Sequence, residues 1–418
     1  MRLCDCQPPR RQFLTCRPSE EDQTLSGILD IERLRGETPG CAVVAHFNHS
    51  GMSLPATATL TAITDHLLRE ALQGGMEVAA AAASTVEIAR KDAAALLGAA
   101  PAEVAFTTSG SAGFGLVFAA LPPLLSGNRI LVGRQEWGGN LATMRDAADR
   151  AGARIEAIPT REDGSVDPDS LAGMIDERVR LISLTWLPAN GGLINDAAAV
   201  GRIARAAGVP YFVDAGQALG QIPVDVAAIG CDMLKGTARK YLRGPRGTAL
   251  LYVRADFIPR LTPAFLDVQS GPWTGEGPRR RADARLFETI EGSVALQLGL
   301  GVALAQARTI GIGAIRARIR KLADGLRSLL SEIPGVSVRD LGSERSGLVS
   351  FTVEGQGAQD MRSRLAAKRI IVGANGIPYT PLDMKARGLT EIIRASVSYL
   401  NTEDEITSLA AAVRAAAR

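Results

Sequence analysis

Apolar and polar residues follow two different periods along this chain. From Ala58 to Leu97 the apolar positions recur every three or four residues, which predicts helix with a break at Gly74–Gly75. Between about residue 100 and about residue 300, short β-rich runs alternate with alanine-rich helical stretches. The runs are Val104–Thr107, Arg129–Val132, Leu181–Thr185, Tyr211–Asp214 and Thr248–Val253. Alternation of this kind predicts an α/β fold with a mostly parallel sheet sandwiched by helices.

The pattern changes near residue 300. Residues 295–333 predict a long helix with a break at Gly311–Gly313, and two strand-like runs, Gly347–Val353 and Ile392–Val397, precede a final alanine-rich helix. This mixture predicts a smaller C-terminal α+β domain. We therefore expect a tail or arm over residues 1–45, a large domain over residues 46–300 and a small domain over residues 301–418.

Composition narrows the class of protein. The 418 residues include 47 Lys and Arg against 44 Asp and Glu, a net charge of +3, so we expect neither a nucleic-acid nor a membrane partner. No window is long and apolar enough for a transmembrane helix, and the N-terminus lacks the apolar centre of a secretory signal. Five cysteines, an odd number, favour the reducing cytoplasm. Because no second Cys or His pair accompanies Cys4 and Cys6, we expect no metal site.

Candidate chemistry lies where predicted strands end, since open α/β sheets bind ligands at the carboxyl ends of their strands. Ser109-Gly110-Ser111 follows one strand and opens a helix, a turn that either binds phosphate or only caps the helix. Asp214 ends another strand, where a carboxylate either meets a cation or caps the next helix. Lys240 lies between an apolar segment and a Gly/Pro-rich turn, where a lysine of lowered pKa can form a Schiff base. A solvated loop lysine is the alternative, and we expect it for Lys235.

The order and spacing of these residues resemble one enzyme family. Asp214, Gln217, Thr237 and Lys240 match the pattern of fold-type-I pyridoxal-phosphate (PLP) enzymes, in the class V aminotransferase group that includes the cysteine desulfurases. The resemblance runs from about residue 36 to about residue 410 and includes Glu37-Thr-Pro-Gly, Phe47-Asn-His-Ser-Gly, Pro188-Ala-Asn-Gly-Gly and Arg239-Lys-Tyr-Leu-Arg-Gly-Pro. The nearest branch is similar to the C–S lyases of ergothioneine biosynthesis and the isopenicillin-epimerase-like proteins.

This resemblance implies an aspartate-aminotransferase-like large domain that binds pyridoxal 5'-phosphate. It implies a Schiff base on Lys240, which then acts as base at the substrate Cα, and a cofactor ring held by Asp214, Gln217 and a stacked Trp137. It implies a phosphate site of Ser109, Gly110, Ser111 and Thr237, which Arg239 is expected to join. Arg394 is expected to bind the substrate carboxylate, and Asn190 to bind substrate in the stretch where the family carries an asparagine.

One departure from the family shapes the expected reaction. Desulfurases carry a catalytic cysteine in the loop before the last strand, and the stretch Gly373–Met384 has none, so we expect an enzyme other than a cysteine desulfurase. The expected function is C–S lysis by β-elimination from a cysteine conjugate, with an aminotransferase or an amino-acid epimerase as alternatives. A non-catalytic cofactor-binding scaffold is the alternative outside enzymes. The resemblance also implies a small-molecule amino-acid substrate and a homodimer.

Overall fold

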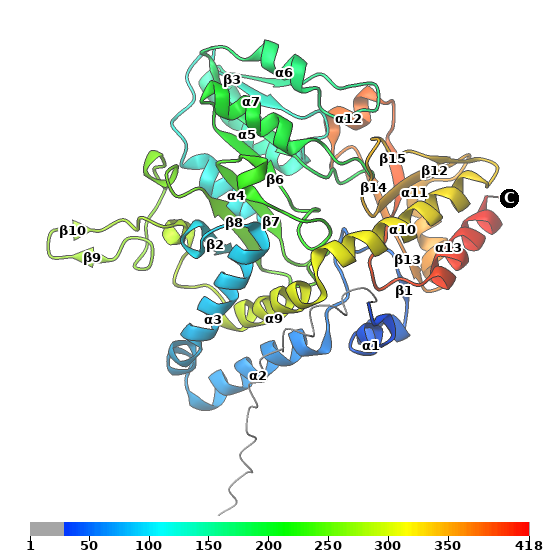
Figure 1. The fold of residues 1–418 in the computed structure, drawn as a ribbon, viewed down its shortest axis with the longest axis horizontal. Coiled ribbons are helices and arrows are strands. Elements are labelled where there is room, and N and C mark those ends of the chain that lie inside the picture. Colours follow the sequence, from blue (N-terminus) through cyan, green and yellow to red (C-terminus); the bar gives the residue numbers. More distant parts are fainter. Residues whose placement is uncertain (1–28, 418) are drawn as a thin grey trace, which may run out of the picture.

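A seven-stranded sheet forms the centre of the computed structural model, which describes residues 29–417 (Figure 1). The strand order is β2-β8-β7-β6-β5-β3-β4, and only β8 runs antiparallel to its neighbours. The strands are β2 (Val104–Thr107), β3 (Arg129–Val132), β4 (Arg154–Ala157), β5 (Val179–Thr185), β6 (Tyr211–Asp214), β7 (Met233–Thr237) and β8 (Ala249–Val253). The predicted α/β fold with a mostly parallel sheet is confirmed.

Helices cover both faces of this sheet because its strands bury side chains on both sides. On β6, Phe212 belongs to one core and Val213 to the other. The helices on the Val213 face include α3 (Gly75–Leu97), α7 (Ala197–Ala207) and α9 (Val294–Ile310), and those on the Phe212 face include α4 (Gly110–Ala119) and α5 (Gly138–Ala151). The shorter helices α6 (Pro168–Met174) and α8 (Val226–Ile229) lie in connections.

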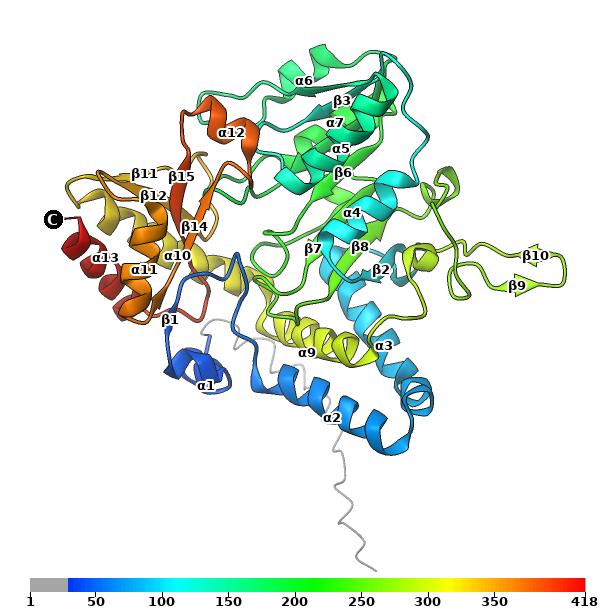
Figure 2. The same cartoon turned by 180° about the vertical axis from the view of Figure 1, so that it is seen from behind.

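A second sheet, antiparallel and four-stranded, lies in the C-terminal part (Figure 2). Its order is β11 (Val336–Val338), β12 (Leu348–Val353), β15 (Glu391–Ser396) and β14 (Gly373–Gly376). Side chains from α10 (Ile312–Ser331), α11 (Ala358–Ala367) and α13 (Glu403–Ala416) pack on it in one apolar core. The helix α12 (Pro381–Ala386) lies between β14 and β15 along the chain.

The N-terminal segment joins the C-terminal core. After α1 (Ile31–Gly36), the strand β1 (Ala45–His46) pairs in parallel with β13 (Ile370–Ile371), and the fully buried Phe47 packs in the core of the C-terminal sheet. The helix α2 (Thr57–Gln73) then crosses to the large sheet, where it packs on α9. The predicted domain boundaries stay predictions, and residues 1–28 of the predicted arm lie outside the described residues.

Both predicted helix breaks are confirmed. Gly74 separates α2 from α3 with a φ of 93°, a conformation that favours glycine, and Gly311 separates α9 from α10 with a φ of 85°. The remaining short elements are the hairpin β9 (Trp273–Thr274) and β10 (Gly277–Pro278) and the 3₁₀ turns η2 (Pro39–Ala42), η3 (Pro101–Glu103), η4 (Ile258–Arg260) and η5 (Ala284–Phe287). Within residues 29–417, no single helix has the length and apolar content to cross a membrane. The bent pair α9–α10 reaches that length and apolar content only when its two helices are counted together.

Candidate active site

A cavity of 650 Å³ lies between the large sheet and the C-terminal sheet. Its walls include the ends of β6 and β7, the start of α4, residues of β14 and β15, and the loop Asn48–Met52. The structure brings together in this cavity every predicted site residue except Asn190. These residues are Ser109, Gly110, Ser111, Trp137, Asp214, Gln217, Thr237, Arg239, Lys240 and Arg394.

The start of α4 offers unpaired backbone N–H groups to the cavity. Ser109 is the N-cap of this helix, and its hydroxyl accepts a hydrogen bond from the Ala112 N–H at 3.0 Å. A side chain at Gly110 would place its Cβ 2.8 Å from Thr237 Oγ1, so glycine is required where α4 approaches β7. The positive end of the helix dipole therefore faces the cavity beside Thr237.

Asp214 is buried and surrounded by donors. Its carboxylate accepts from the Gly216 N–H at 2.9 Å and from Asn140 Nδ2 at 3.0 Å, and it forms an ion pair with Lys235 Nζ at 3.0 Å. Burial alone would raise the pKa of Asp214, but the ammonium groups of Lys235 and Lys240 outweigh it and hold that pKa below its usual range. The site thus holds a fixed negative charge at the end of β6.

The prediction that Lys235 is a solvated loop residue is wrong. Lys235 lies inside β7 with 4% of its surface exposed, and the β6–β7 register places it directly beside Asp214. The sequence Met-Leu-Lys-Gly-Thr has a single β-branched residue, Thr237, and no polar–apolar alternation, so it does not predict β7. Only the long-range pairing of β7 with β6 explains why a lysine is tolerated there.

Lys240 follows β7 and points into the cavity, where its Nζ lies 5.8 Å from the centre of the Trp137 ring. Burial lowers the pKa of Lys240 to about 7, with Arg239, Lys235 and Arg394 adding to the effect and Asp214 opposing it. A substantial fraction of Lys240 is therefore uncharged near neutral pH, which is the form of a lysine that acts as nucleophile or base.

Trp137 immediately precedes α5, and its backbone N–H donates to Thr185 Oγ1 at 2.9 Å. Its ring is tilted 47° to that of Tyr379, with 5.5 Å between the ring centres. The two rings form an aromatic wall of the cavity, although Tyr379 was not predicted from the sequence.

Gln217 and Arg394 each present an unpaired buried atom. Gln217 Nε2 donates to the Ser50 carbonyl at 3.2 Å, while Oε1 has no partner among the described residues. Arg394, on β15, donates from Nη1 to the Ala189 carbonyl at 2.8 Å and from Nη2 to Asn48 Oδ1 at 3.2 Å. Its Nε has no hydrogen-bond partner, and no carboxylate within residues 29–417 pairs with it. Burial lowers the pKa of Arg394 to about 10, so an anion entering the cavity would meet an uncompensated cation.

Asn190 is not among the residues that line the cavity, although its Oδ1 accepts from the cavity residue Asn375 at 3.0 Å, so the expected substrate contact stays a prediction. Its Nδ2 donates to the Gly376 carbonyl and to Thr380 Oγ1, each at 3.0 Å, so it braces the loop after β14. The neighbouring Ala189 lines the cavity instead, because its carbonyl accepts from Arg394.

Sequence reasoning also missed several cavity residues. They are Arg246, Asn48, Met52, Tyr379 and Asn375. Two of these residues lie in stretches that the sequence already marks as part of the site. Asn48 belongs to the family-like motif Phe47-Asn-His-Ser-Gly, and Arg246 belongs to the Gly/Pro-rich turn after Lys240. Arg246 lies close enough to Arg239 to help lower the pKa of that guanidinium, after the larger effect of burial. In the described part of the chain neither of these arginines forms an ion pair, so two cations face the start of α4 uncompensated.

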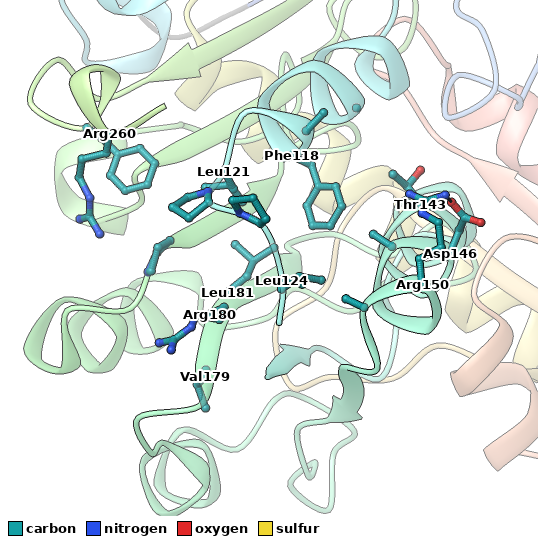
Figure 3. A pocket seen from close by; sticks show the side chains of 18 of the residues that line it. Phe118, Leu121, Leu124, Thr143, Asp146, Arg150, Val179, Arg180, Leu181 and Arg260 are labelled. Carbon is teal, nitrogen blue, oxygen red and sulfur yellow. Dashed lines mark hydrogen bonds and ion pairs between the residues drawn. The ribbon is translucent and has the colours of Figure 1, made fainter. Parts of the chain in front are cut away.

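A second cavity, of 830 Å³, opens on the α4–α5 side of the large sheet (Figure 3). Its walls are mainly apolar, with Phe118, Leu121 and Leu124 among them, and Arg150, Arg180 and Arg260 are also present. It contains none of the predicted site residues. Residues 29–417 hold no cluster of three or more His, Cys, Asp or Glu that could bind a metal, and Cys4 and Cys6 lie outside the described residues.

The residues of the first cavity fit pyridoxal phosphate. A phosphate suits the start of α4 with Thr237, Arg239 and Arg246 beside it. The buried Asp214 carboxylate suits a protonated ring nitrogen, and the unpaired Gln217 amide oxygen suits a ring hydroxyl. Lys240, with its lowered pKa, suits Schiff-base chemistry with an aldehyde.

Comparisons with known proteins agree with this fit. The family model described as aminotransferase class-V matches residues 50–409. A probable hercynylcysteine sulfoxide lyase of Mycobacterium tuberculosis is 31% identical over 389 residues, which are 92% of this chain and 93% of the relative. A probable cysteine desulfurase of Xylella fastidiosa is 31% identical over 298 residues, which are 70% of each chain.

Solved structures share the fold. The apo structure of a cysteine desulfurase from Thermococcus onnurineus has a TM-score of 0.86 at 23% identity, covering 94% of this chain and 99% of that one. A C-DES variant with glycine covalently linked to its PLP cofactor has a TM-score of 0.82 at 24% identity, covering 91% of this chain and 98% of that one.

These comparisons correct one expectation. The absence of a cysteine from Gly373–Met384 predicts an enzyme other than a cysteine desulfurase, and that prediction is wrong, because relatives named as cysteine desulfurases match most of the chain. Of the cysteines in residues 29–417, Cys231 is buried and Cys41 is half-buried. The family resemblance itself is confirmed: this chain belongs to the class V aminotransferase family, whose cofactor is pyridoxal 5'-phosphate, and it is an enzyme that acts on amino acids.

Proposed function

We propose that this enzyme is a C–S lyase that removes the Cα proton of a cysteine-derived amino acid and expels the sulfur group from Cβ. One observation supports an amino acid as the substrate: Lys240, with a pKa of about 7, faces the same cavity as the buried Arg394, which has no carboxylate partner among residues 29–417. The C–S part is supported by the relative named as a hercynylcysteine sulfoxide lyase, which matches 92% of this chain.

Arg394 is proposed to bind the substrate carboxylate. Its hydrogen bonds to Ala189 and Asn48 hold the guanidinium in one orientation, and its free Nε still offers a donor. A planar guanidinium binds a carboxylate through two parallel hydrogen bonds, which fixes the rotation of the substrate about Cα. That rotation decides which Cα bond is broken.

The cofactor is proposed to lie between Trp137 and the strand end that carries Asp214. When bound, it supplies a conjugated ring that accepts the electron pair left at Cα. Ser109, Gly110, Ser111, Thr237 and Arg239 are proposed to hold its phosphate, and Asp214 to keep its ring nitrogen protonated. Gln217 is proposed to hydrogen-bond the ring oxygen through its unpaired Oε1.

Lys240 is proposed to move the proton. Burial keeps much of this amine uncharged near neutral pH, so it can accept the Cα proton. The Trp137 ring, whose centre lies 5.8 Å from the Lys240 nitrogen, covers one side of the amine.

We also propose a homodimer, with its contact over α2 and the start of α3. This surface exposes Leu67, Leu68, Leu72 and Met76, and Leu72 is 82% and Met76 is 75% exposed. Large apolar residues grouped on two adjoining helices are typical of a protein interface.

A panel of amino acids, read by mass spectrometry, tests the reaction. Cysteine conjugates and sulfoxides should give pyruvate, ammonia and the released sulfur compound. A keto acid that keeps the side chain would indicate an aminotransferase, and inverted configuration at Cα an epimerase. A protein that binds the cofactor and converts no amino acid would indicate a scaffold.

A further inference from the structure

A second lysine, Lys235, lines the cavity and has no part in the proposed reaction. Lys235 pairs with Asp214 at 3.0 Å, and the two side chains are 5% and 8% exposed. An ion pair so buried lies in a medium of low dielectric, where its charges act strongly on their neighbours. The carboxylate that Lys235 contacts is the one proposed to hold the ring nitrogen of the cofactor.

Glu136 stands behind this pair and is completely buried. Asn140, on α5, donates from one amide nitrogen to Glu136 Oε1 at 2.8 Å and to Asp214 Oδ2 at 3.0 Å. The Thr185 N–H donates to Glu136 Oε2 at 3.1 Å. The Asn140 amide thus joins two carboxylates, one of which also pairs directly with the ammonium group of Lys235.

We propose that Lys235 is a positioning residue that shares the Asp214 carboxylate with the ring nitrogen of the cofactor, and that Glu136 opposes its charge. The proposal rests on the role proposed for Asp214. A carboxylate that pairs with two cations stabilises each of them less than it would stabilise one alone. Lys235 therefore lowers the proton affinity of the ring nitrogen and of the nitrogen of Lys240, and Glu136 raises both.

Four other charged side chains face Asp214, Lys235 and Glu136, and all four are present in every variant compared below. They are Lys240, Arg239, Arg246 and Arg394. Burial, with Asp214 nearby, raises the pKa of Glu136 to about 7 against the effects of Asn140, Lys235 and Thr185, so its charge responds to its surroundings near neutral pH.

The experiment is a pH titration of the visible absorbance of the cofactor-loaded protein, whose midpoint reports the proton on the nitrogen of Lys240. Lys235→Gln keeps a hydrogen-bond donor beside Asp214 and removes the charge, so we expect the midpoint to rise by about one pH unit or more. Lys235→Arg restores the charge and should return the midpoint toward that of the wild type. Glu136→Gln should shift the midpoint in the opposite direction.

The same titration in an Asp214→Asn background separates the possible failures. Lys235→Gln should shift the midpoint much less there, because its effect runs through Asp214. If Asp214→Asn alone leaves the wild-type midpoint unchanged, the role proposed for Asp214 is wrong. If Asp214→Asn shifts the midpoint and Lys235→Gln does not, only this inference fails. If Lys235→Gln does not fold, the titration of Glu136→Gln decides. An unchanged midpoint in that variant would contradict the proposal that Glu136 opposes the charge of Lys235.

Discussion

Lys240 and Trp137 meet across the cavity, with the lysine Nζ 5.8 Å from the centre of the indole ring. Burial lowers the pKa of Lys240 to about 7 and so leaves its amine available for bond formation. A second buried lysine, Lys235, is held instead by an ion pair with Asp214. The two lysines are five positions apart, and their surroundings predict different chemistry.

Borohydride reduction of the cofactor-loaded protein checks this difference. Lys240→Ala should abolish the reducible adduct, since the other cavity lysine among residues 29–417, Lys235, is held in an ion pair with Asp214. Lys235→Gln should keep it. An adduct that persists in Lys240→Ala, located by peptide mass spectrometry, would contradict the assignment.

The pH dependence of stability offers a test without cofactor. A lysine whose pKa falls to about 7 in the folded state binds fewer protons there than in the unfolded chain, so its cost to stability is full below pH 7 and disappears as the pH rises toward 10. Cofactor-free Lys240→Met should therefore be more stable than wild type at pH 6, as measured by urea unfolding. The difference should decline above pH 7, by up to about 1.4 kcal/mol per pH unit. The exposed Lys91→Met is the control and should show no such trend.

Asp214→Asn should retain the cofactor and lose most activity. The amide cannot stabilise a protonated ring nitrogen, and it leaves Lys235 without its buried counter-charge. Without a protonated ring nitrogen, kcat should fall by about two or more orders of magnitude. As a separate effect, removing one partner of a buried ion pair typically costs about 3–5 kcal/mol of folding stability. Turnover near that of the wild type, in steady-state kinetics, would show that another group serves that nitrogen.

Arg394→Lys should leave the cofactor absorbance unchanged, raise KM strongly and lower kcat. The substitution keeps a positive charge but loses the paired donors that orient a carboxylate. Steady-state kinetics on the amino acid that the panel identifies, with the decarboxylated amine for comparison, measure both effects. Equal turnover of amine and amino acid by the wild type would mean that Arg394 is structural.

Leu72→Glu should weaken the proposed dimer, because it places a charge on the most exposed apolar residue of α2. Analytical ultracentrifugation of the cofactor-loaded protein measures the change. The matched control is Leu125→Glu, which alters an exposed leucine on a different part of the surface. A wild-type enzyme that sediments as an active monomer would contradict the dimer.

Local patterns were sufficient for the strands and helices that carry most of the cavity. The strand ends at Thr107 and Asp214 follow from β-rich runs, and the helix breaks at Gly74 and Gly311 follow from glycine in helical sequence. The misses depend on contacts between distant segments. Lys235 is buried only because β7 pairs with β6. The amide of Asn190 donates to Thr380, a contact between distant segments that the sequence does not predict.

The pairing of β1 with β13 bears on how the chain is made. Ala45, His46 and Phe47 emerge from the ribosome early in synthesis. Their partners at Ile370–Ile371 are translated near the end. The C-terminal core therefore cannot pack before translation is nearly finished. Until then the Phe47 side chain stays unburied. The same late event brings Asn48 to Arg394, so the wall proposed to bind the substrate carboxylate forms only after β15 has been synthesised. A nascent chain arrested before β13 should fail to protect this segment from protease.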